Sequence, residues 1–148
     1  MRIHGHSMAV ELPSQWEGRI FRHPGGEPTL HAANFPLPAE DGDYGAKATG
    51  SMGPGGAFVA ITEFEPEMAN QPLFHRRGLP PRIRPADLSP RTLMRVRSGQ
   101  AGMQRFFHDH GRAFCLYVVV GTEPSRMRLC RWVSDVLGTV EIHRRPGS

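Results

Sequence analysis

Alternation of apolar and polar positions predicts most of the strands in the first half of the chain. Residues 3–10 alternate with a period of two, which places His4 and His6 on one face of a first strand. Two further extended stretches follow at residues 16–22 and 29–35, separated by a turn rich in Gly and Pro. Residues 57–64 are apolar on both faces near their start, so we expect a strand in the middle of a sheet.

The second half of the chain predicts a hairpin, a helix and a short final strand. Residues 102–108 and 112–120 form the arms of the hairpin, with Gly111 available for a positive φ in its turn. Pro124 suits the first turn of a helix that runs to residue 137, and residues 139–142 can add a strand. The apolar positions of the helix define one wide stripe, made of Met127, Leu129, Cys130, Trp132, Val133, Val136 and Leu137.

Consecutive strands joined by turns imply an antiparallel sheet, and one helix can cover one of its faces. The sequence therefore predicts a single α+β domain over residues 1–142, with an antiparallel sheet of about six to seven strands and the C-terminal amphipathic helix packed on one face. Residues 36–56 and 65–90 are two long loops rich in Gly and Pro, and Ser89 with Pro90 can begin a short helix. Residues 143–148 are predicted to be a short flexible tail.

Composition agrees with a globular chain and argues against a membrane-spanning one. Of the 148 residues, 39% are apolar and 22% are charged, which is the balance of a packed domain. No apolar run approaches the roughly 18 residues that a membrane span needs, and the first residues lack the apolar core of a secretory signal. Cys115 and Cys130 are too few for a disulfide framework, so we expect a cytoplasmic location with both thiols reduced.

Charge is unevenly distributed between the two halves of the chain. Residues 1–75 carry 4 basic and 9 acidic groups, whereas residues 76–148 carry 14 basic and 5 acidic groups. All of the basic groups except Lys47 are arginines, a bias that we interpret mainly as GC-rich coding. Such an asymmetry can mark an anionic partner for the second half, and the alternative is that the acidic half simply packs beside the basic half in one domain. The candidate partner-binding residues are Arg76, Arg77, Arg82, Arg84, Arg91, Arg95 and Arg97.

Both ends of the chain resemble a known group of small proteins. The opening strand, Leu12-Pro13-x-x-Trp16 and next strand, together with the closing helix that leads into residues 139–142, resemble PsbP-like α/β/α sandwich proteins, including the LpqN-like proteins of actinobacteria. The resemblance covers about 35 residues at the two ends. It implies a fold used for binding and assembly, with no catalytic motif to transfer.

Histidines are the main candidates for metal chemistry. His4 and His6 share a strand face, and His108 and His110 lie at a hairpin turn, so two His-x-His pairs that met in space would supply the ligands of a zinc site. Glu40, Asp41 and Asp43 lack the rest of a calcium-binding loop, and we interpret them as part of a solvated loop. Cys115 and Cys130 both fall in apolar patterns and are expected to be inert core residues.

The sequence therefore favours a non-catalytic cytoplasmic protein that binds another protein, in an interaction or assembly role. No cofactor is expected. One alternative is a zinc-binding protein or metal-dependent enzyme built on His4, His6, His108 and His110. A second alternative is nucleic-acid binding through the Arg-rich half, which would need a basic surface with stacking aromatic side chains.

Overall fold

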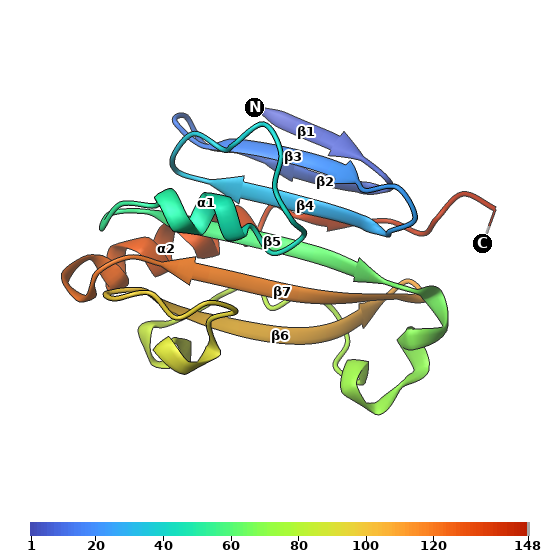
Figure 1. Cartoon of the computed structure of the whole chain (residues 1–148). Helices are drawn as coiled ribbons and strands as arrows, with labels where there is room; N and C mark the ends of the chain where they lie inside the picture. The colour runs from blue at the N-terminus through green and yellow to red at the C-terminus, as the bar shows by residue number, and fades with distance from the viewer. Residues whose placement is uncertain (148) are drawn as a thin grey trace.

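The computed structural model describes residues 1–147 as two antiparallel sheets and two α-helices (Figure 1). The larger sheet has the strand order β3-β4-β5-β7-β6, and the smaller sheet has the order β1-β2-β8. The strands are β1 (Arg2–Gly5), β2 (Met8–Glu11), β3 (Glu17–Arg22), β4 (Pro28–Ala33), β5 (Ala57–Phe64), β6 (Ala101–Asp109), β7 (Arg112–Val120) and β8 (Glu141–Ile142). The helices are α1 (Ala46–Ser51) and α2 (Arg126–Leu137), with 3-10 turns η1 (Pro66–Asn70), η2 (Pro72–Phe74), η3 (Pro85–Asp87), η4 (Pro90–Thr92) and η5 (Glu123–Ser125). The α+β class is confirmed.

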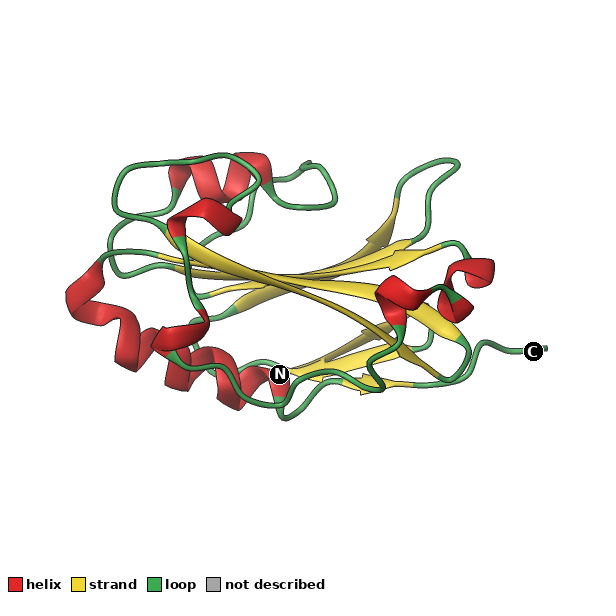
Figure 2. Ribbon diagram, turned by 90° about the horizontal axis from the view of Figure 1, so that it is seen from below, coloured by secondary structure: helices red, strands yellow, loops and turns green. Residues whose placement is uncertain are grey.

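Apolar side chains fill both faces of the larger sheet. The smaller sheet and α2 cover one face, and α1 with its surrounding loop covers the other (Figure 2). Within β5, Val59 and Ile61 belong to the first apolar cluster, whereas Phe58 and Ala60 belong to the second. The prediction of a central strand at residues 57–64 is therefore confirmed.

The prediction of one sheet with six to seven strands is wrong, because the structure has eight strands in two sheets over residues 1–147. The expected strand at residues 3–10 folds back on itself as the β1–β2 hairpin, in which Gly5 pairs with Met8. The two turn residues, His6 and Ser7, have φ angles of 50° and 60°. Such turns usually carry Asn-Gly or a similar pair, so these two residues give no sequence signal of a hairpin.

Helix α2 buries a narrower stripe than its sequence predicts. The buried positions are Leu129, Cys130, Val133, Val136 and Leu137. Met127 and Trp132 were expected in the same stripe, but their exposed fractions are 69% and 39%. At 3.6 residues per turn, these two positions lie beyond opposite borders of the buried stripe, so one packed face cannot include them.

The second long connection covers the open edge of β6. At one end of the strand, the His108 N–H donates to the Arg76 carbonyl at 2.8 Å and the His108 carbonyl accepts from Gly78 N–H at 2.8 Å. At the other end, Gly102 and Ser89 exchange two backbone hydrogen bonds of 2.8 and 3.0 Å. These bonds occupy part of an edge that would otherwise offer unpaired groups to another chain. The expected helix after Ser89 is reduced to the single turn η4.

The first long connection contains helix α1, which the sequence did not predict. The Asp41 carboxylate accepts hydrogen bonds from the backbone N–H groups of Gly42 (2.8 Å), Lys47 (2.9 Å) and Ala48 (2.8 Å). A carboxylate at this position satisfies backbone donors at the start of a helix. The interpretation of this acidic stretch as a solvated loop is therefore wrong for Asp41, whose exposed fraction is 9%.

A buried ion cluster joins the two sheets. Arg112 lies at the start of β7 and Glu63 near the end of β5, with exposed fractions of 2% and 4%. The guanidinium of Arg112 donates to both Glu63 carboxylate oxygens, at 3.0 and 2.7 Å, and a second arginine, Arg145, also binds this carboxylate closely. The prediction of a flexible tail from residue 143 did not anticipate this contact. Ser148, at the end of that tail, lies outside the described residues.

Candidate functional site

The outward face of α2 combines exposed apolar side chains with arginines. Met127 and Trp132 are the two apolar residues that the helix leaves exposed. The guanidinium of Arg128 lies over the Trp132 ring, 5.4 Å from its centroid, which is the geometry of a cation–π contact. Arg131 and Asp135 are also exposed on this side of the helix. This composition matches the centre of protein interfaces, where Trp, Met and Arg are enriched.

Residues 82–84 add two more arginines beside α2. The Ile83 N–H donates to the Ser134 hydroxyl at 2.9 Å, and that hydroxyl donates back to the Ile83 carbonyl at 3.2 Å. The Ile83 side chain is buried, so Arg82 and Arg84 on either side of it stay exposed. A hollow of about 350 Å³ runs along this junction, and its lining includes both arginines and Arg131.

We call this region the α2 surface. It comprises Arg82, Arg84, Met127, Arg128, Arg131, Trp132 and Asp135. Among the described residues, none of its four arginines forms a salt bridge. Asp135 is the one carboxylate of the set, so the α2 surface carries an excess of uncompensated positive charge.

The seven arginines expected to bind a partner do not share one surface. Arg82 and Arg84 belong to the α2 surface, whereas Arg76 and Arg77 follow the far end of the β6 edge. Arg97 lies against Gly50 of α1, with its Nη2 atom 3.0 Å from the position that a Cβ would take there. Arg91 and Arg95 are exposed in and after η4. Arg128 and Arg131 were not among the residues predicted to bind a partner. Both lie off the apolar stripe of the predicted helix, and this position alone indicated that they would be exposed.

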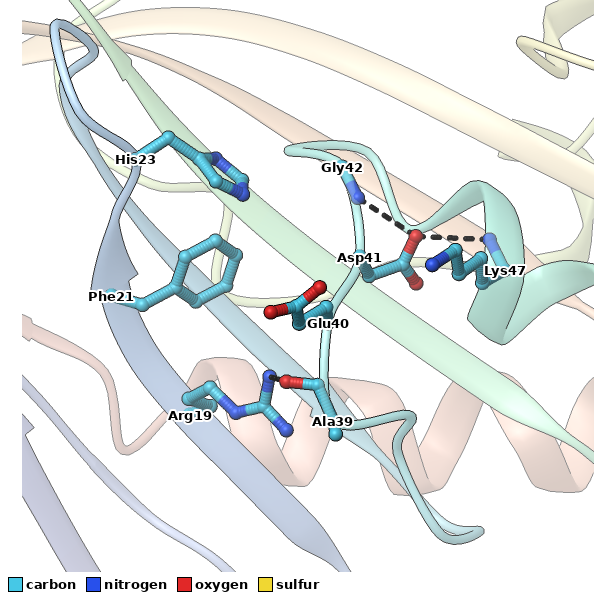
Figure 3. Close-up of a pocket in the computed structure, with 8 residues that line it drawn as sticks. All are labelled: Arg19, Phe21, His23, Ala39, Glu40, Asp41, Gly42 and Lys47. Atoms are coloured by element: carbon cyan, nitrogen blue, oxygen red, sulfur yellow. Dashed lines mark hydrogen bonds between the residues drawn. The ribbon is translucent and has the colours of Figure 1, made fainter.

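A second hollow, of about 630 Å³, lies between β3 and the loop before α1. Figure 3 shows Arg19 and Phe21 on β3, and His23 just after it, facing the loop that carries Glu40 and Asp41. The Arg19 guanidinium donates to the carbonyls of Pro38 and Ala39, both at 2.7 Å. Arg19 and Asp41 both bind the backbone of this loop. Their role at this hollow is therefore to anchor the loop, and Arg19 joins it to the larger sheet.

The polar groups left over in this hollow have opposite charges. Among the described residues, neither Glu40 nor Lys47 forms a salt bridge. His23 is engaged, since its Nδ1 atom lies 2.9 Å from the Asp43 carboxylate. With one unpaired acidic group and one unpaired basic group among the described residues, this hollow favours neither an anionic nor a cationic ligand. The α2 surface is therefore the stronger candidate site.

His31 is a buried histidine beneath the same loop. Its Nε2–H donates to the Asp43 carbonyl at 2.8 Å, and its ring packs edge-on against Phe21 and Phe58, each with a centroid distance of 4.9 Å. Burial lowers the pKa of His31 below its ordinary value of 6.5, against the opposing effect of the Asp43 hydrogen bond. His31 is therefore held neutral in the folded chain.

We expect this buried imidazole to make the fold less stable in mild acid. The pKa of His31 is lower in the folded chain than in the unfolded chain, so the unfolded chain takes up the proton first as the pH falls. Its contribution is complete above pH 6.5 and is lost as the pH falls toward the folded-state pKa, with a slope of at most about 1.4 kcal/mol per pH unit. Urea unfolding between pH 7.5 and 5.5 should show a shallower pH dependence for His31→Gln than for the natural chain. The exposed-site variant His4→Gln serves as the control, and an equal slope in all three proteins would contradict the assignment.

The structure does not bring the four predicted zinc ligands together. His4 is exposed on β1 and His6 lies in the β1–β2 turn. His108 donates from Nδ1 to the Phe74 carbonyl at 2.6 Å, and His110 pairs with Asp109 at 2.8 Å. Among the residues whose side chains the structure describes, no group of three His, Cys, Asp or Glu has an arrangement that could hold a metal ion.

Both cysteines lie in the core as the sequence predicts. Cys115 and Cys130 are free thiols with exposed fractions of 0% and 2%. Burial raises the pKa of Cys115 to about 12 and also raises the pKa of Cys130. A thiol must ionise to act as a nucleophile, and burial disfavours the thiolate at both positions.

Comparison with known proteins returns no relative of this chain. No protein family matches it, and neither does any curated protein or solved structure. The resemblance to PsbP-like and LpqN-like proteins therefore stays a prediction. In the part of the chain that the structure describes, no helix has the length and apolar character needed to cross a membrane.

Proposed function

We propose that this chain is a non-catalytic binding protein whose α2 surface docks an acidic segment of a partner protein. One observation carries the proposal: Met127 and Trp132 are exposed on a helix face beside four arginines that lack salt bridges to described residues. Exposed apolar side chains supply contact area, and uncompensated arginines attract carboxylates and select against basic partners.

An acidic protein segment fits this surface better than nucleic acid does. A nucleic acid needs phosphate contacts repeated along a continuous basic track. Here Arg97 lies on the α1 side of the larger sheet and Arg76 near one end of the β6 edge, so the arginines do not form such a track. A mixed Trp, Met and Arg patch is instead typical of a protein interface.

The free, buried state of Cys115 and Cys130 is consistent with the cytoplasmic location that we propose. The location and the binding role are independent parts of the proposal. Cell fractionation tests the cytoplasmic location, and titration with an acidic peptide tests the binding role.

Reversing one charge on the α2 surface should weaken binding of an acidic probe. We expect Arg131→Glu to reduce the affinity for a fluorescein-labelled oligoglutamate peptide by about tenfold or more, because it removes an attraction and adds a repulsion. Fluorescence anisotropy at physiological salt measures the effect. The matched control is Arg91→Glu, which makes the same charge change at η4, away from α2.

Two outcomes would contradict the proposal. One is equal weakening by Arg131→Glu and Arg91→Glu, which would show a general charge effect with no dedicated surface. The other is tighter binding of a DNA oligonucleotide of the same net charge as the peptide, which would favour the nucleic-acid alternative.

A further inference from the structure

A small hollow next to the α2 surface is lined by both tryptophans of the chain. Its volume is about 250 Å³, and its walls come from residues 13–16, which follow β2, and from Asn34, Trp132 and Asp135. Trp16 is 9% exposed and Trp132 is 39% exposed, so one indole forms the deeper wall and the other the rim. This space is comparable to that of several water molecules, at about 30 Å³ each, and suits one large side chain.

The Asn34 amide in the wall of this hollow is not available to a ligand. The side chain of Asn34 is already used, since its Nδ2 donates to the Gly55 carbonyl at 3.0 Å and its Oδ1 accepts from Ala57 N–H at 2.8 Å. Charge of both signs lies at the rim, with Arg128 over the Trp132 ring and Asp135 in the lining. A charged occupant of either sign would meet a like charge, so an uncharged apolar group is favoured.

The turn that forms one lip of the hollow contains a residue in a strained conformation. Trp16 N–H donates to the Pro13 carbonyl at 3.2 Å, and Gln15 between them has a φ of 72°. Glycine takes this conformation without steric cost, whereas glutamine does not. Residues in such conformations are found more often at ligand-binding sites. Here the strained residue is Gln15, whose exposed side-chain amide lies at the mouth of the hollow.

We propose that the Trp16–Trp132 hollow is an anchor pocket for one apolar side chain of the acidic partner segment. Asp135 lines both this hollow and the one that contains Arg82, Arg84 and Arg131, so the two flank α2 side by side. The partner therefore carries an apolar anchor, preferably aromatic, flanked by carboxylates that reach the arginines. This inference rests on the proposed function and specifies the partner that the α2 surface selects.

The test compares two oligoglutamate peptides that differ only at a central phenylalanine or alanine. The phenylalanine peptide should bind the full chain about tenfold more tightly, as expected for an aromatic anchor in a pocket. Trp16 and Trp132 are the two tryptophans of the chain, so its intrinsic fluorescence should change more on binding of the phenylalanine peptide than on binding of the alanine peptide. Trp132→Ala should remove the difference between the peptides, and Met127→Ala, at the other border of the helix stripe, should preserve it.

Equal affinity of the two peptides for the natural chain would overturn the anchor pocket while leaving acidic docking intact. Equal weakening of both peptides by Trp132→Ala would also overturn it. If neither peptide binds, the acidic docking has failed, and neutral N-acetyl-phenylalaninamide decides on the pocket alone. A saturable fluorescence change that Trp132→Ala abolishes would support the pocket, and the absence of such a change would reject it.

Discussion

Replacing Glu63 by glutamine should lower the free energy of unfolding by about 3–5 kcal/mol, the usual cost of removing one partner of a buried ion pair. The loss is large because Arg112 stays behind with an exposed fraction of 2% and no carboxylate to balance its charge. A neutral amide cannot replace the two charge-assisted bonds that Arg112 now makes. Urea unfolding at neutral pH measures the change.

The control for this variant is an exposed ion pair in the same protein. Glu141 lies 2.6 Å from Arg2 in the smaller sheet, and both side chains are about half exposed. Exposed pairs of this kind contribute little, so Glu141→Gln should leave the free energy of unfolding unchanged within error. If Glu63→Gln proved as mild as Glu141→Gln, the ion cluster would not hold the two sheets together.

Replacing Gly45 by alanine should also be strongly destabilising, by about 2–5 kcal/mol, because two separate costs add. Gly45 has a φ of 68°, which L-residues with a Cβ rarely adopt. A Cβ at this position would lie 2.1 Å from Cζ of the fully buried Phe58, so either the ring or the loop before α1 must move. Urea unfolding of the variant, in parallel with the natural chain, gives the loss.

Gly25 separates the two costs of that substitution. It has a φ of 75°, but nothing lies within 4 Å of the position that its Cβ would take. Gly25→Ala should therefore cost only the conformational part, about 1–2 kcal/mol. Similar losses at Gly25 and Gly45 would show that the loop yields to Phe58 without resistance, contrary to the packing described above.

The sequence predicts an element well when its pattern of apolar residues corresponds directly to the faces that are buried in the fold. Residues 57–64 and 112–120 are apolar on both faces because they lie in the middle of the larger sheet, and both appear as β5 and β7. The β6–β7 turn was also predicted correctly, because Gly111 has the positive φ expected there, at 72°. In these segments the local pattern and the tertiary environment agree.

The misses occur where a side-chain contact to the backbone overrides the local pattern. His6 and Ser7 adopt positive φ angles, and their carbonyls accept hydrogen bonds from the distant Arg112. Helix α1 begins where the Asp41 carboxylate binds its backbone. Arg112 is distant in sequence, and Asp41 precedes the backbone donors Lys47 and Ala48 by more residues than an ordinary helix cap, so neither contact shows in a local pattern.

The candidate site could be predicted only in its chemistry. Arginine excess in the second half favoured an anionic partner, but the sequence did not show which positions of the wide apolar stripe of α2 are left exposed, namely Met127 and Trp132. Their exposure depends on how wide a strip of α2 the larger sheet can cover. That width is a property of the assembled layers, and only the structure shows it.

The contacts of Arg112 join segments that are far apart in the sequence, and this has a consequence for folding during synthesis. Its guanidinium makes five hydrogen bonds, to Glu63 twice and to the carbonyls of His6, Ser7 and His143. The β1–β2 hairpin also needs β8 as a neighbour, and β8 lies more than a hundred residues later in the chain. We therefore expect the β1–β2 hairpin to reach its native contacts only after residues 141–145 have been synthesised.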